Sequence, residues 1–482
     1  MNEFKDLPLY SALKKYIQTN RTHFDVPGHK RNPKNLLQKE FFDFKLQELD
    51  VSSAKDLDLI GTPKGVIKDA SRLMARAFSA GDAYMMLNGT TSGVQNMILS
   101  TIKPGEKIIL PRNIHKSAIN ALILSGAVPV YVEPVIDIDF GVAHGVTTED
   151  IKHAISNNRD AKAVLIINPT YYGATSDLIE IANLAHEHHM LLLTDEAHGA
   201  HFYFNKNLPI GSMTIGADMS AVSLHKTGGS LTQSSIVLSH RRNIDFYHVM
   251  KTIDLTQTTS PSYLLLASLD VARYVLEHDG SKLLDDALYI AEYGRNKVNE
   301  IGGYYAIGQE IKGNPGVFDI DLSKLSIKVS GIGLTGIEVY DILRDEYNIQ
   351  VELGDIHTIM AVVSIGDTME MMDRLIFALK DIKIKYATNK KFTTDFLYSR
   401  PIMVVTPREA YYSNKRMVSL DEAVGEISGE SVMAYPPGIP IVAPGEKITK
   451  EVVAYIEFLK KQDCILTGTD DPTIDTIQVL GS

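Results

Sequence analysis

The segment SLHKTGG at residues 223–229 decides the fold, because it joins a short apolar run, Ala221–Leu224, to a glycine-rich loop. The apolar run predicts a strand, and Lys226 follows its carboxyl end. A buried amine in that position can form a Schiff base with a carbonyl compound. Taken by itself, such a segment more often carries a solvated loop lysine. The surrounding sequence therefore has to decide between a solvated lysine and a buried, reactive one.

Apolar runs and helical stretches alternate around this segment, from Val66 to Ser239. The expected strands are Lys107–Leu110, Val128–Val132, Ala163–Ile167, Met190–Thr194, Ala221–Leu224 and Ser235–Leu238. The expected helices include Val66–Phe78, His115–Ser125, Thr148–Ile155, Asp177–His188 and, further on, Tyr263–His278. Strands that alternate with helices predict a mainly parallel sheet buried on both faces, with ligands at the carboxyl ends of its strands.

Asp195 closes another of these apolar runs, in LLLTDEAHG at residues 191–199. Burying an unpaired carboxylate costs several kcal/mol, so a carboxylate at this position needs a partner. A metal ion, an arginine or a protonated ring nitrogen would each serve. The alternative role for Asp195 is the N-cap of a helix.

Two further polar segments open expected helices. NGTTSG at residues 88–93 precedes Val94–Ile102, and its glycines and hydroxyl residues offer backbone N–H groups and the positive end of a helix dipole to a phosphate. PRNIHKS at residues 111–117 follows a strand, and its His115 could stack on a planar ring. An ordinary helix cap is the alternative interpretation of both segments.

The four segments together are more specific than any one of them. In chain order they supply a phosphate cradle at residues 90–92, a ring platform at His115, a carboxylate at Asp195 and an amine at Lys226. Pyridoxal 5'-phosphate needs these groups, because the amine holds its aldehyde, the carboxylate keeps its ring nitrogen protonated, and the cradle and platform hold its phosphate and ring. The combination predicts a pyridoxal-phosphate enzyme.

The chain resembles the fold-type-I pyridoxal-phosphate decarboxylases of ornithine, lysine and arginine, most closely the short, Gram-positive-type arginine decarboxylases that lack an N-terminal wing domain. The resemblance covers nearly the whole chain. Its matching segments are FDVPGHK (24–30), PKG (63–65), NGTTS (88–92), PRNIHKS (111–117), NPTYYG (168–173), DEAHG (195–199), SLHKTGGSLTQSS (223–235), TTSPSYLLLA (258–267) and YPPGIPIVAPGE (435–446). This resemblance implies an α/β fold with a mainly parallel seven-stranded sheet in the large domain, a smaller α/β domain and a C-terminal α+β domain.

The resemblance also implies a role for each matched residue. Lys226 would be the Schiff-base lysine, Asp195 would pair with the pyridine nitrogen, and His198 would lie near the imine. The phosphate would be held by Thr90, Thr91, Ser92, Ser223 and His225, and the ring would lie between His115 and Ala197. Thr259 and Ser260 would reach the phosphate of a neighbouring subunit, which implies a homodimer with shared active sites, or a higher oligomer built from it.

The implied reaction is α-decarboxylation of a basic amino acid, and overall resemblance favours L-arginine, giving agmatine and CO2 for polyamine synthesis. Lysine, giving cadaverine, is the runner-up, and an aminotransferase, an aldolase or a non-catalytic protein on the same fold are further alternatives. Lys226 or His198 would protonate Cα. His29 and Glu430 are the candidate substrate residues, although Glu430 could equally be a surface glutamate. Gly61 and Gly425-Glu426 depart from residues common in relatives, which leaves substrate-side detail open.

Two other patterns are weaker. GIGLTG at residues 331–336 matches GxGxxG, but a dinucleotide domain needs a further βαβ half, which residues 354–390 hardly supply. A strand–turn–helix in the smaller domain is the better interpretation. HEHH at residues 186–189 does not set three ligands on one helical face, so we expect a solvated helix end and no metal site.

Composition sets the outer limits of the function. The 482 residues carry a net charge of −11, and an acidic chain is a poor candidate for binding nucleic acid or an anionic membrane. Because Cys464 is the only cysteine and neither a signal peptide nor an apolar run of ~20 residues is visible, we expect a cytoplasmic protein. The expected divisions are an N-terminal arm (1–50), a pyridoxal-phosphate-binding large domain (51–280), a small α/β domain (281–390) and a C-terminal decarboxylase domain (391–482).

Overall fold

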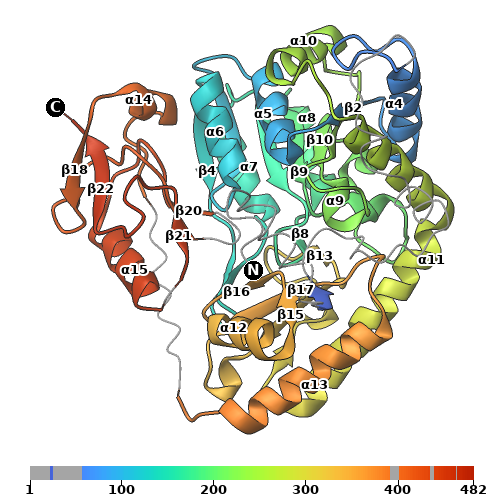
Figure 1. Ribbon diagram of the computed structural model, residues 1–482. Coiled ribbons are helices and arrows are strands. Elements are labelled where there is room, and N and C mark those ends of the chain that lie inside the picture. Colours follow the sequence, from blue (N-terminus) through green and yellow to red (C-terminus); the bar gives the residue numbers. More distant parts are fainter. Residues whose placement is uncertain (1–21, 25–56, 391–400, 435–438, 463, 482) are drawn as a thin grey trace, which may run out of the picture.

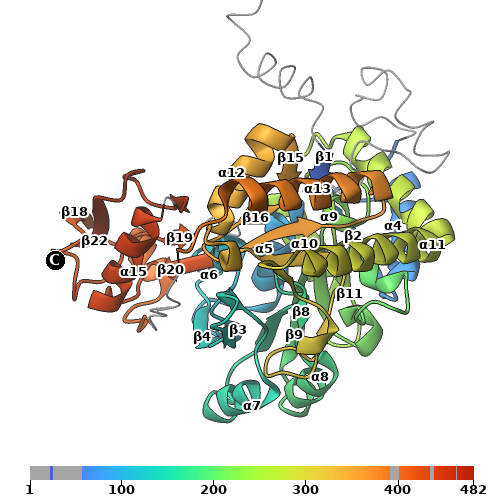
Figure 2. The same ribbon diagram turned by 90° about the horizontal axis from the view of Figure 1, so that it is seen from below.

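Two sheets of unequal size form the body of the protein, and a group of smaller sheets from the C-terminal part lies beside them (Figures 1 and 2). A computed structural model describes residues 22–24, 57–390, 401–434, 439–462 and 464–481. Most of the expected arm at residues 1–50 and part of the YPPGIP segment therefore lie outside the described residues.

The larger sheet has seven strands in the order β2-β11-β10-β9-β7-β3-β4. Strand β11 runs antiparallel to β10 and β2, while the pairs from β10 to β4 are all parallel. The strands are β2 (Asp82–Met86), β3 (Lys107–Pro111), β4 (Val128–Val132), β7 (Ala163–Ile167), β9 (Leu191–Glu196), β10 (Met219–Val222) and β11 (Ser235–Ser239). The prediction of a mainly parallel seven-stranded sheet is confirmed.

Helices cover both faces of this sheet. One face carries α4 (Val66–Ala77), α7 (Thr148–Asn157), α8 (Leu178–Glu187) and the first part of α11 (Tyr263–Ile301). The other carries α5 (Gly89–Thr101), α6 (Lys116–Ser125) and α10 (Phe246–Thr256). Neighbouring residues of one strand serve opposite faces, so in β3 Ile109 packs into the first core and Ile108 and Leu110 into the second.

Helix α11 is 39 residues long and runs well past the expected end at His278. Its first part packs Leu266 and Leu269 into the core of the large sheet, and its second part packs Ile290 and Val298 into the core of the small sheet. Gly280 lies inside the helix, where a Cβ atom would meet Phe204 Cβ at 3.2 Å. The glycine therefore marks close packing and not the end of the helix.

The small sheet has four antiparallel strands in the order β12-β14-β17-β16, covered by helices α12 and α13. Their bounds are β12 (Tyr305–Ala306), β14 (Lys324–Lys328), β16 (Leu353–Gly354), β17 (Thr358–Val362), α12 (Gly336–Tyr347) and α13 (Met369–Tyr386). Beside them β15 (Ile349–Val351) pairs in parallel with β1 (Thr22–Phe24), so Phe24, the first residue of the FDVPGHK segment, lies in a strand.

The GxGxxG match joins β14 to α12 within this small sheet. Residues Ser330–Ile332 form a 3-10 turn, and Thr335 caps α12 in a capping box with Glu338. Since both neighbours of β14 are antiparallel, the segment does not belong to a parallel βαβ unit. The interpretation of GIGLTG as a strand–turn–helix is confirmed.

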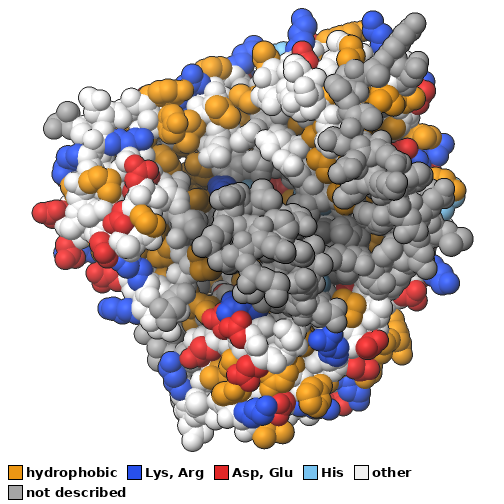
Figure 3. All heavy atoms as spheres, viewed as in Figure 1, with side chains coloured by type: hydrophobic (Ala, Val, Ile, Leu, Met, Phe, Trp, Pro, Cys, Tyr) orange, Lys and Arg blue, Asp and Glu red, His pale blue; other side chains and the backbone are white. Residues whose placement is uncertain are grey.

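The C-terminal part lies at one side of the body in both views (Figures 1 and 2). It has its own core, formed by the buried faces of its strands and of α15. Its elements are α14 (Pro407–Tyr412), β18 (Lys415–Ser419), β19 (Val432–Ala434), β20 (Ile439–Val442), α15 (Lys450–Lys461), β21 (Leu466–Thr467) and β22 (Thr476–Leu480). In Figure 3, acidic and basic side chains are interspersed over its outer surface and over that of the small sheet.

The sequence patterns differ from the structure in a few boundaries. They miss β2, and they place β10 two residues too far along the chain. Lys226 lies in a short helix, α9 (Leu224–Thr227), and not in a loop. The remaining short strands are β5 (Ile136–Asp137), β6 (Val142–Ala143), β8 (Ala174–Thr175) and β13 (Asp319–Ile320). Within the described ranges, no helix combines the length and apolar composition needed to cross a bilayer.

Candidate active site

A cavity of about 1140 Å³ opens at the carboxyl ends of the parallel strands of the large sheet. Its wall is completed by residues 352–357 beside the small sheet and by β20 and α15 of the C-terminal part. The predicted site residues that line it are Thr90, Thr91, His115, Asp195, Ala197, His198, Ser223, His225 and Lys226. The structure therefore brings together groups that are spread over more than a hundred residues of sequence.

Asp195 lies near the end of β9, and Lys226 lies in α9, which follows the neighbouring strand β10. Burial raises the pKa of Asp195, and the charge of Lys226 and the N–H group of Ala197, which donates to Oδ1 over 3.1 Å, oppose this. Burial lowers the pKa of Lys226, against the charges of Glu352 and Asp195. The lysine is thus favoured as a neutral, nucleophilic amine, and a cation in the cavity beside Asp195 would relieve the cost of burying that carboxylate.

His115 caps a helix and lines the cavity at the same time. It is the N-cap of α6, where its Nδ1 accepts the N–H group of Ser117 over 3.2 Å. Because Nδ1 accepts, a neutral ring carries its proton on Nε2. Burial, together with the charges of Lys226 and Lys116, lowers the pKa of His115 to about 4, so the ring in the cavity wall is neutral at neutral pH.

The amino end of α5 supplies the expected phosphate cradle. Gly89, Thr90 and Thr91 line the cavity, and Thr90 Oγ1 hydrogen-bonds to Ser223 Oγ across the site. The side chain of Ser92 is buried and is turned away, since its Oγ donates to the carbonyl of Gly89 over 3.0 Å. The structure thus brings Thr90 and Thr91, but not the Ser92 hydroxyl, to the cavity.

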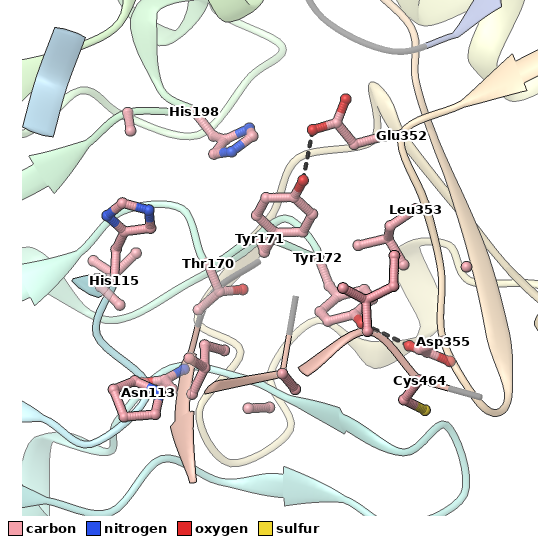
Figure 4. Close-up of a pocket in the computed structure, with 18 of the residues that line it drawn as sticks. Asn113, His115, Thr170, Tyr171, Tyr172, His198, Glu352, Leu353, Asp355 and Cys464 are labelled. Carbon is pink, nitrogen blue, oxygen red and sulfur yellow. Dashed lines mark hydrogen bonds between the residues drawn. The ribbon is translucent and has the colours of Figure 1, made fainter. Parts of the chain in front are cut away.

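The two histidines that flank Lys226 are also held neutral. His225 Nδ1 donates to the carbonyl of Ser234 over 2.9 Å, and burial lowers its pKa to about 4. His198 Nε2 lies 3.0 Å from Lys226 Nζ. The ring of Tyr171 meets the His198 ring edge to face, with centroids 4.8 Å apart (Figure 4).

These residues fit pyridoxal phosphate. The buried Asp195 carboxylate suits a protonated ring nitrogen, and the Lys226 amine suits an aldehyde. The hydroxyl groups of Thr90, Thr91 and Ser223, with the N–H groups of the first turn of α5, suit a phosphate dianion. A cavity of this size has room for the cofactor and for a bound amino acid.

The sequence patterns did not identify several residues of the cavity wall. Glu352 and Asp355, beside the small sheet, accept hydrogen bonds from Tyr171 and Tyr172 over 2.5 and 2.6 Å (Figure 4). Arg112 also lines the cavity. The two tyrosines stand in the NPTYYG segment, which the resemblance marked without assigning them a role, but their acidic partners follow no local pattern.

Four further predicted residues belong to the substrate side, Glu430 and His29, or to the contact with a neighbouring subunit, Thr259 and Ser260. Glu430 does not line the cavity, and its carboxylate accepts the backbone N–H groups of Asp470 and Gln478 over 2.9 and 2.8 Å, so the structure does not bring it together with the other site residues. His29 lies outside the described residues. Thr259 and Ser260 are exposed and do not line the cavity of their own chain.

The histidines at residues 186–189 take separate partners in the structure. His186 Nε2 lies 2.8 Å from an oxygen of Asp218, and His188 Nδ1 donates to the carbonyl of Leu184 over 3.0 Å. Both histidines lie at the carboxyl end of α8, Asp218 directly precedes β10, and none of the three lines the cavity. The two side chains serve local hydrogen bonding at a helix end.

The fold defines the class of the protein. A seven-stranded, mainly parallel sheet between helices, with a smaller α/β unit beside it, is the architecture of the fold-type-I pyridoxal-phosphate enzymes. A constitutive lysine decarboxylase of E. coli has the same fold, with a TM-score of 0.77 and 20% identity over 98% of this chain and 82% of that one.

Sequence comparison defines the family within that class. The model of the major domain of Orn/Lys/Arg decarboxylases matches residues 7–371, and the model of their C-terminal domain matches residues 389–471. The chain is 41% identical to an arginine decarboxylase of Bacillus subtilis over 98% of both chains, and 38% identical to one of Halalkalibacterium halodurans over 100% of this chain and 99% of that one. The chain belongs to the Orn/Lys/Arg decarboxylase family, whose members are pyridoxal-phosphate-dependent amino-acid decarboxylases.

Proposed function

We propose that this enzyme decarboxylates L-arginine at its α-carbon to give agmatine and CO2. The observation that carries the choice of substrate is the identity of about 40% to arginine decarboxylases along the full length of the chain. The lysine decarboxylase with the same fold is only 20% identical, so lysine, giving cadaverine, is the second candidate. Agmatine production would make the enzyme part of polyamine synthesis.

The chain's own residues have distinct tasks in this proposal. Bound pyridoxal phosphate supplies a ring that accepts the electron pair left behind when CO2 departs. Asp195 would hold a proton on the ring nitrogen, Lys226 would hold the aldehyde carbon, and Thr90, Thr91 and Ser223 would bind the phosphate. His115 and Ala197 would confine the ring from its two faces, and His225 would lie beside the phosphate. Lys226 or His198 returns a proton to Cα.

We assign the distal cation of the substrate to Glu352. Its carboxylate lines the cavity, accepts the hydroxyl of Tyr171 over 2.5 Å and interacts electrostatically with Lys226. Asp355 is less available, since its oxygens accept the hydroxyl groups of Tyr172 and Thr358 and the backbone N–H groups of its own loop. A glutamate can bind a guanidinium through two parallel hydrogen bonds, whereas a lysine ammonium is a single point charge.

The test is amine analysis of the cofactor-loaded enzyme given arginine, lysine and ornithine separately. Agmatine should be the main product, and Lys226→Ala should abolish CO2 release from every substrate. Glu352→Gln should lower kcat/KM for arginine by about tenfold or more, because one charge of the pair is lost. Tyr171→Phe keeps the carboxylate and should lower it less. Cadaverine as the dominant product would overturn the choice of arginine.

We propose further that the enzyme is a homodimer with shared active sites, or a higher oligomer built from such dimers. Thr259 and Ser260 are exposed in the segment that follows α10, and α10 also exposes Leu255 by 86% and Tyr247 by 76%. Contiguous exposed apolar patches mark interaction sites, and we propose that a second copy of the chain covers these two side chains. A second copy packed on this surface would bring its own Thr259 and Ser260 toward the neighbouring phosphate site.

Mixing two inactive variants tests the shared site. Ser260→Asp places a negative charge against the partner's phosphate site, and Lys226→Ala removes the essential amine. If the sites are shared, one of the two sites in each heterodimer is intact, and an equal mixture should recover about a quarter of the wild-type activity. Recovery of no activity, when sedimentation shows that heterodimers form, would contradict the shared site.

We propose that the four divisions expected from the sequence act as one unit. Residues 51–280 would bind the cofactor, residues 281–390 would carry Glu352 to the substrate, and residues 391–482 would close the cavity. We also propose a cytoplasmic location, since a chain whose only cysteine is Cys464 forms no intrachain disulfide. Cell fractionation with a tagged chain tests the location.

A further inference from the structure

The imidazole of His198 lies between two lysines. Its Nε2 is 3.0 Å from Lys226 Nζ, and its Nδ1 is 2.8 Å from Lys324 Nζ. His198 is 5% exposed and Lys324, the first residue of β14, is 2% exposed. The three side chains therefore form a continuous hydrogen-bonded row, Lys324–His198–Lys226, that connects the small sheet to the large one.

Proton counting restricts the states that this row can adopt. An ammonium group can only donate hydrogen bonds, and a neutral imidazole has one N–H group and one lone pair. If both lysines were ammonium ions, one of the two short contacts would place an N–H group against another N–H group. An imidazolium ion between two ammonium ions would place an N–H group against another N–H group in both contacts. At least one lysine of the row is therefore a neutral amine.

The chemistry of the site identifies the neutral lysine. Lys226 needs a lone pair to attack an aldehyde carbon, and burial favours its neutral form. Lys324 is then the ammonium ion that donates to Nδ1, and the proton of His198 is on Nε2, which points at Lys226. This arrangement satisfies every short contact in the row.

A second row of contacts fixes the turn that carries Lys324. His201 Nδ1 lies 3.1 Å from Thr227 Oγ1, and His201 Nε2 lies 3.0 Å from an oxygen of Asp321. The Asp321 carboxylate also accepts the N–H and hydroxyl groups of Ser323 over 3.0 and 2.6 Å. One turn is thus connected to the neighbouring residues Thr227 and Lys226 twice, from Asp321 through His201 and from Lys324 through His198. The two connections leave Lys324 little freedom to move.

We propose that Lys324 is a positioning residue that holds His198 as a neutral imidazole with its proton on Nε2, directed at the nitrogen of Lys226. His198 is then a donor at the reacting nitrogen in every turnover, and it does not become a fixed positive charge that would compete with the ring nitrogen near Asp195. The activity part of the test rests on the proposed decarboxylation, whereas the proton position can be measured on the cofactor-free protein.

Several charged and titratable groups face His198 and must be considered in the test. Burial lowers the pKa of His198, and protonation of Lys226 or Lys324, followed by that of His201 or His225, acts in the same direction. Tyr171 packs on the ring and links it to Glu352 through its hydroxyl. Removing Lys324 takes away one cation and leaves the other groups in place.

The experiment is ¹⁵N NMR of selectively labelled histidine in cofactor-free protein, with His198→Asn to assign the signal. In the wild type, His198 should stay neutral, with its proton on Nε2, at pH values at which an ordinary imidazole, whose pKa is about 6.5, is already protonated. In Lys324→Met, the pKa of His198 should rise, and the Nδ1–H form should become populated. Lys324→Arg keeps a cation and should behave as the wild type.

Activity supplies the second readout. With cofactor and arginine, Lys324→Met should lower kcat by about tenfold or more and shift the acidic limb of the pH profile upward. Lys324→Arg should keep most of the wild-type kcat. A side chain that only fills space would not make arginine better than methionine at this position. Lys328→Met, at the other end of β14 where the ammonium lies over the Phe140 ring, is the matched control and should change neither readout.

Three results would overturn the proposal. If the pKa of His198 and the position of its proton are the same in Lys324→Met as in the wild type, Lys324 does not hold that proton on Nε2. An imidazolium signal for the wild type at pH 7 would contradict the proton count. An equal loss of kcat in Lys324→Arg and Lys324→Met, with both variants folded, would leave only a structural role. Absence of decarboxylation in the wild type would refute the proposed reaction and would leave the NMR result standing.

Discussion

Burial governs the charge of the single residues around the cavity. His115, His198 and His225 have lowered pKa values, and burial is the largest cause for each. Asp195 is shifted the other way, so the site disfavours charge on its acids and on its bases alike. A cofactor that carries both a phosphate dianion and a protonated ring nitrogen complements such a site.

The pKa of His115 makes a prediction about stability. The folded value is about 4, whereas an unfolded histidine has a pKa of about 6.5, so the unfolded chain binds the proton first as the pH falls. The stabilising effect is fully present above about pH 6.5 and is lost as the pH falls toward 4. At pH 5 the loss should be about 2 kcal/mol for His115 in urea unfolding of cofactor-free protein.

His115→Asn provides the comparison for that measurement. Asparagine can still accept a hydrogen bond at the N-cap of α6 but does not titrate. The variant should therefore lose less stability than the wild type between pH 7 and pH 5, whatever the other titrating groups contribute. Equal losses in the two proteins would contradict the assignment of a neutral buried ring to His115.

At the scale of the elements, glycine residues allow α12 to pack closely against the small sheet. A Cβ atom on Gly336, the first residue of α12, would lie 2.0 Å from the carbonyl oxygen of Thr358 in β17. A Cβ atom on Gly354 would lie 2.4 Å from the carbonyl oxygen of Gly336. The glycines of this region serve close backbone packing, and the loop that carries Glu352 and Asp355 depends on it.

Gly336→Ala should therefore separate α12 from β17. We expect a loss of about 2 kcal/mol in the free energy of unfolding and a higher KM for arginine, because the Glu352 loop would shift. Gly65→Ala is the matched control: Gly65 also stands at the start of a helix, α4, but its Cβ would meet Asp58 only at the ordinary distance of 3.6 Å. Equal stability of the two variants, measured by chemical denaturation, would refute the packing argument.

At the scale of the whole molecule, a buried ion pair joins the C-terminal part to the large sheet. Arg112 lies 2.7 Å from Glu446, with side-chain exposures of 4% and 1%, and it also donates to the carbonyls of Pro440 and Ile441 in β20 over 3.1 and 3.4 Å. Burial raises the pKa of Glu446, and Arg112 opposes this. Arg112 thus connects the cavity wall of the body to the strand that closes the cavity.

Breaking this pair should loosen the C-terminal part. Arg112→Met leaves Glu446 buried and unpaired, which should cost about 3 kcal/mol or more and increase hydrogen exchange in β20. The double variant Arg112→Met with Glu446→Leu removes both charges and should recover part of the lost stability. A double variant that is as unstable as the sum of the two single variants would show that the ion pair itself contributes nothing.

The sequence by itself determined the large sheet and the cofactor side of the site. The residues on the cofactor side, such as Asp195, Lys226 and Thr90, close an apolar strand, follow one or open a helix. Their position in the fold therefore follows from the local sequence pattern. The same local logic failed where a helix changed partners, as α11 does after His278.

Only the tertiary structure decided the substrate side and the links between sheets. Tyr171 meets Glu352 across 181 positions of sequence, and His198 meets Lys324 across 126. No spacing rule connects such residues, because their approach depends on how the small sheet packs against the large one. The cofactor site could therefore be predicted from segments, whereas the carboxylate proposed for the substrate and the lysine proposed to hold His198 required the folded chain.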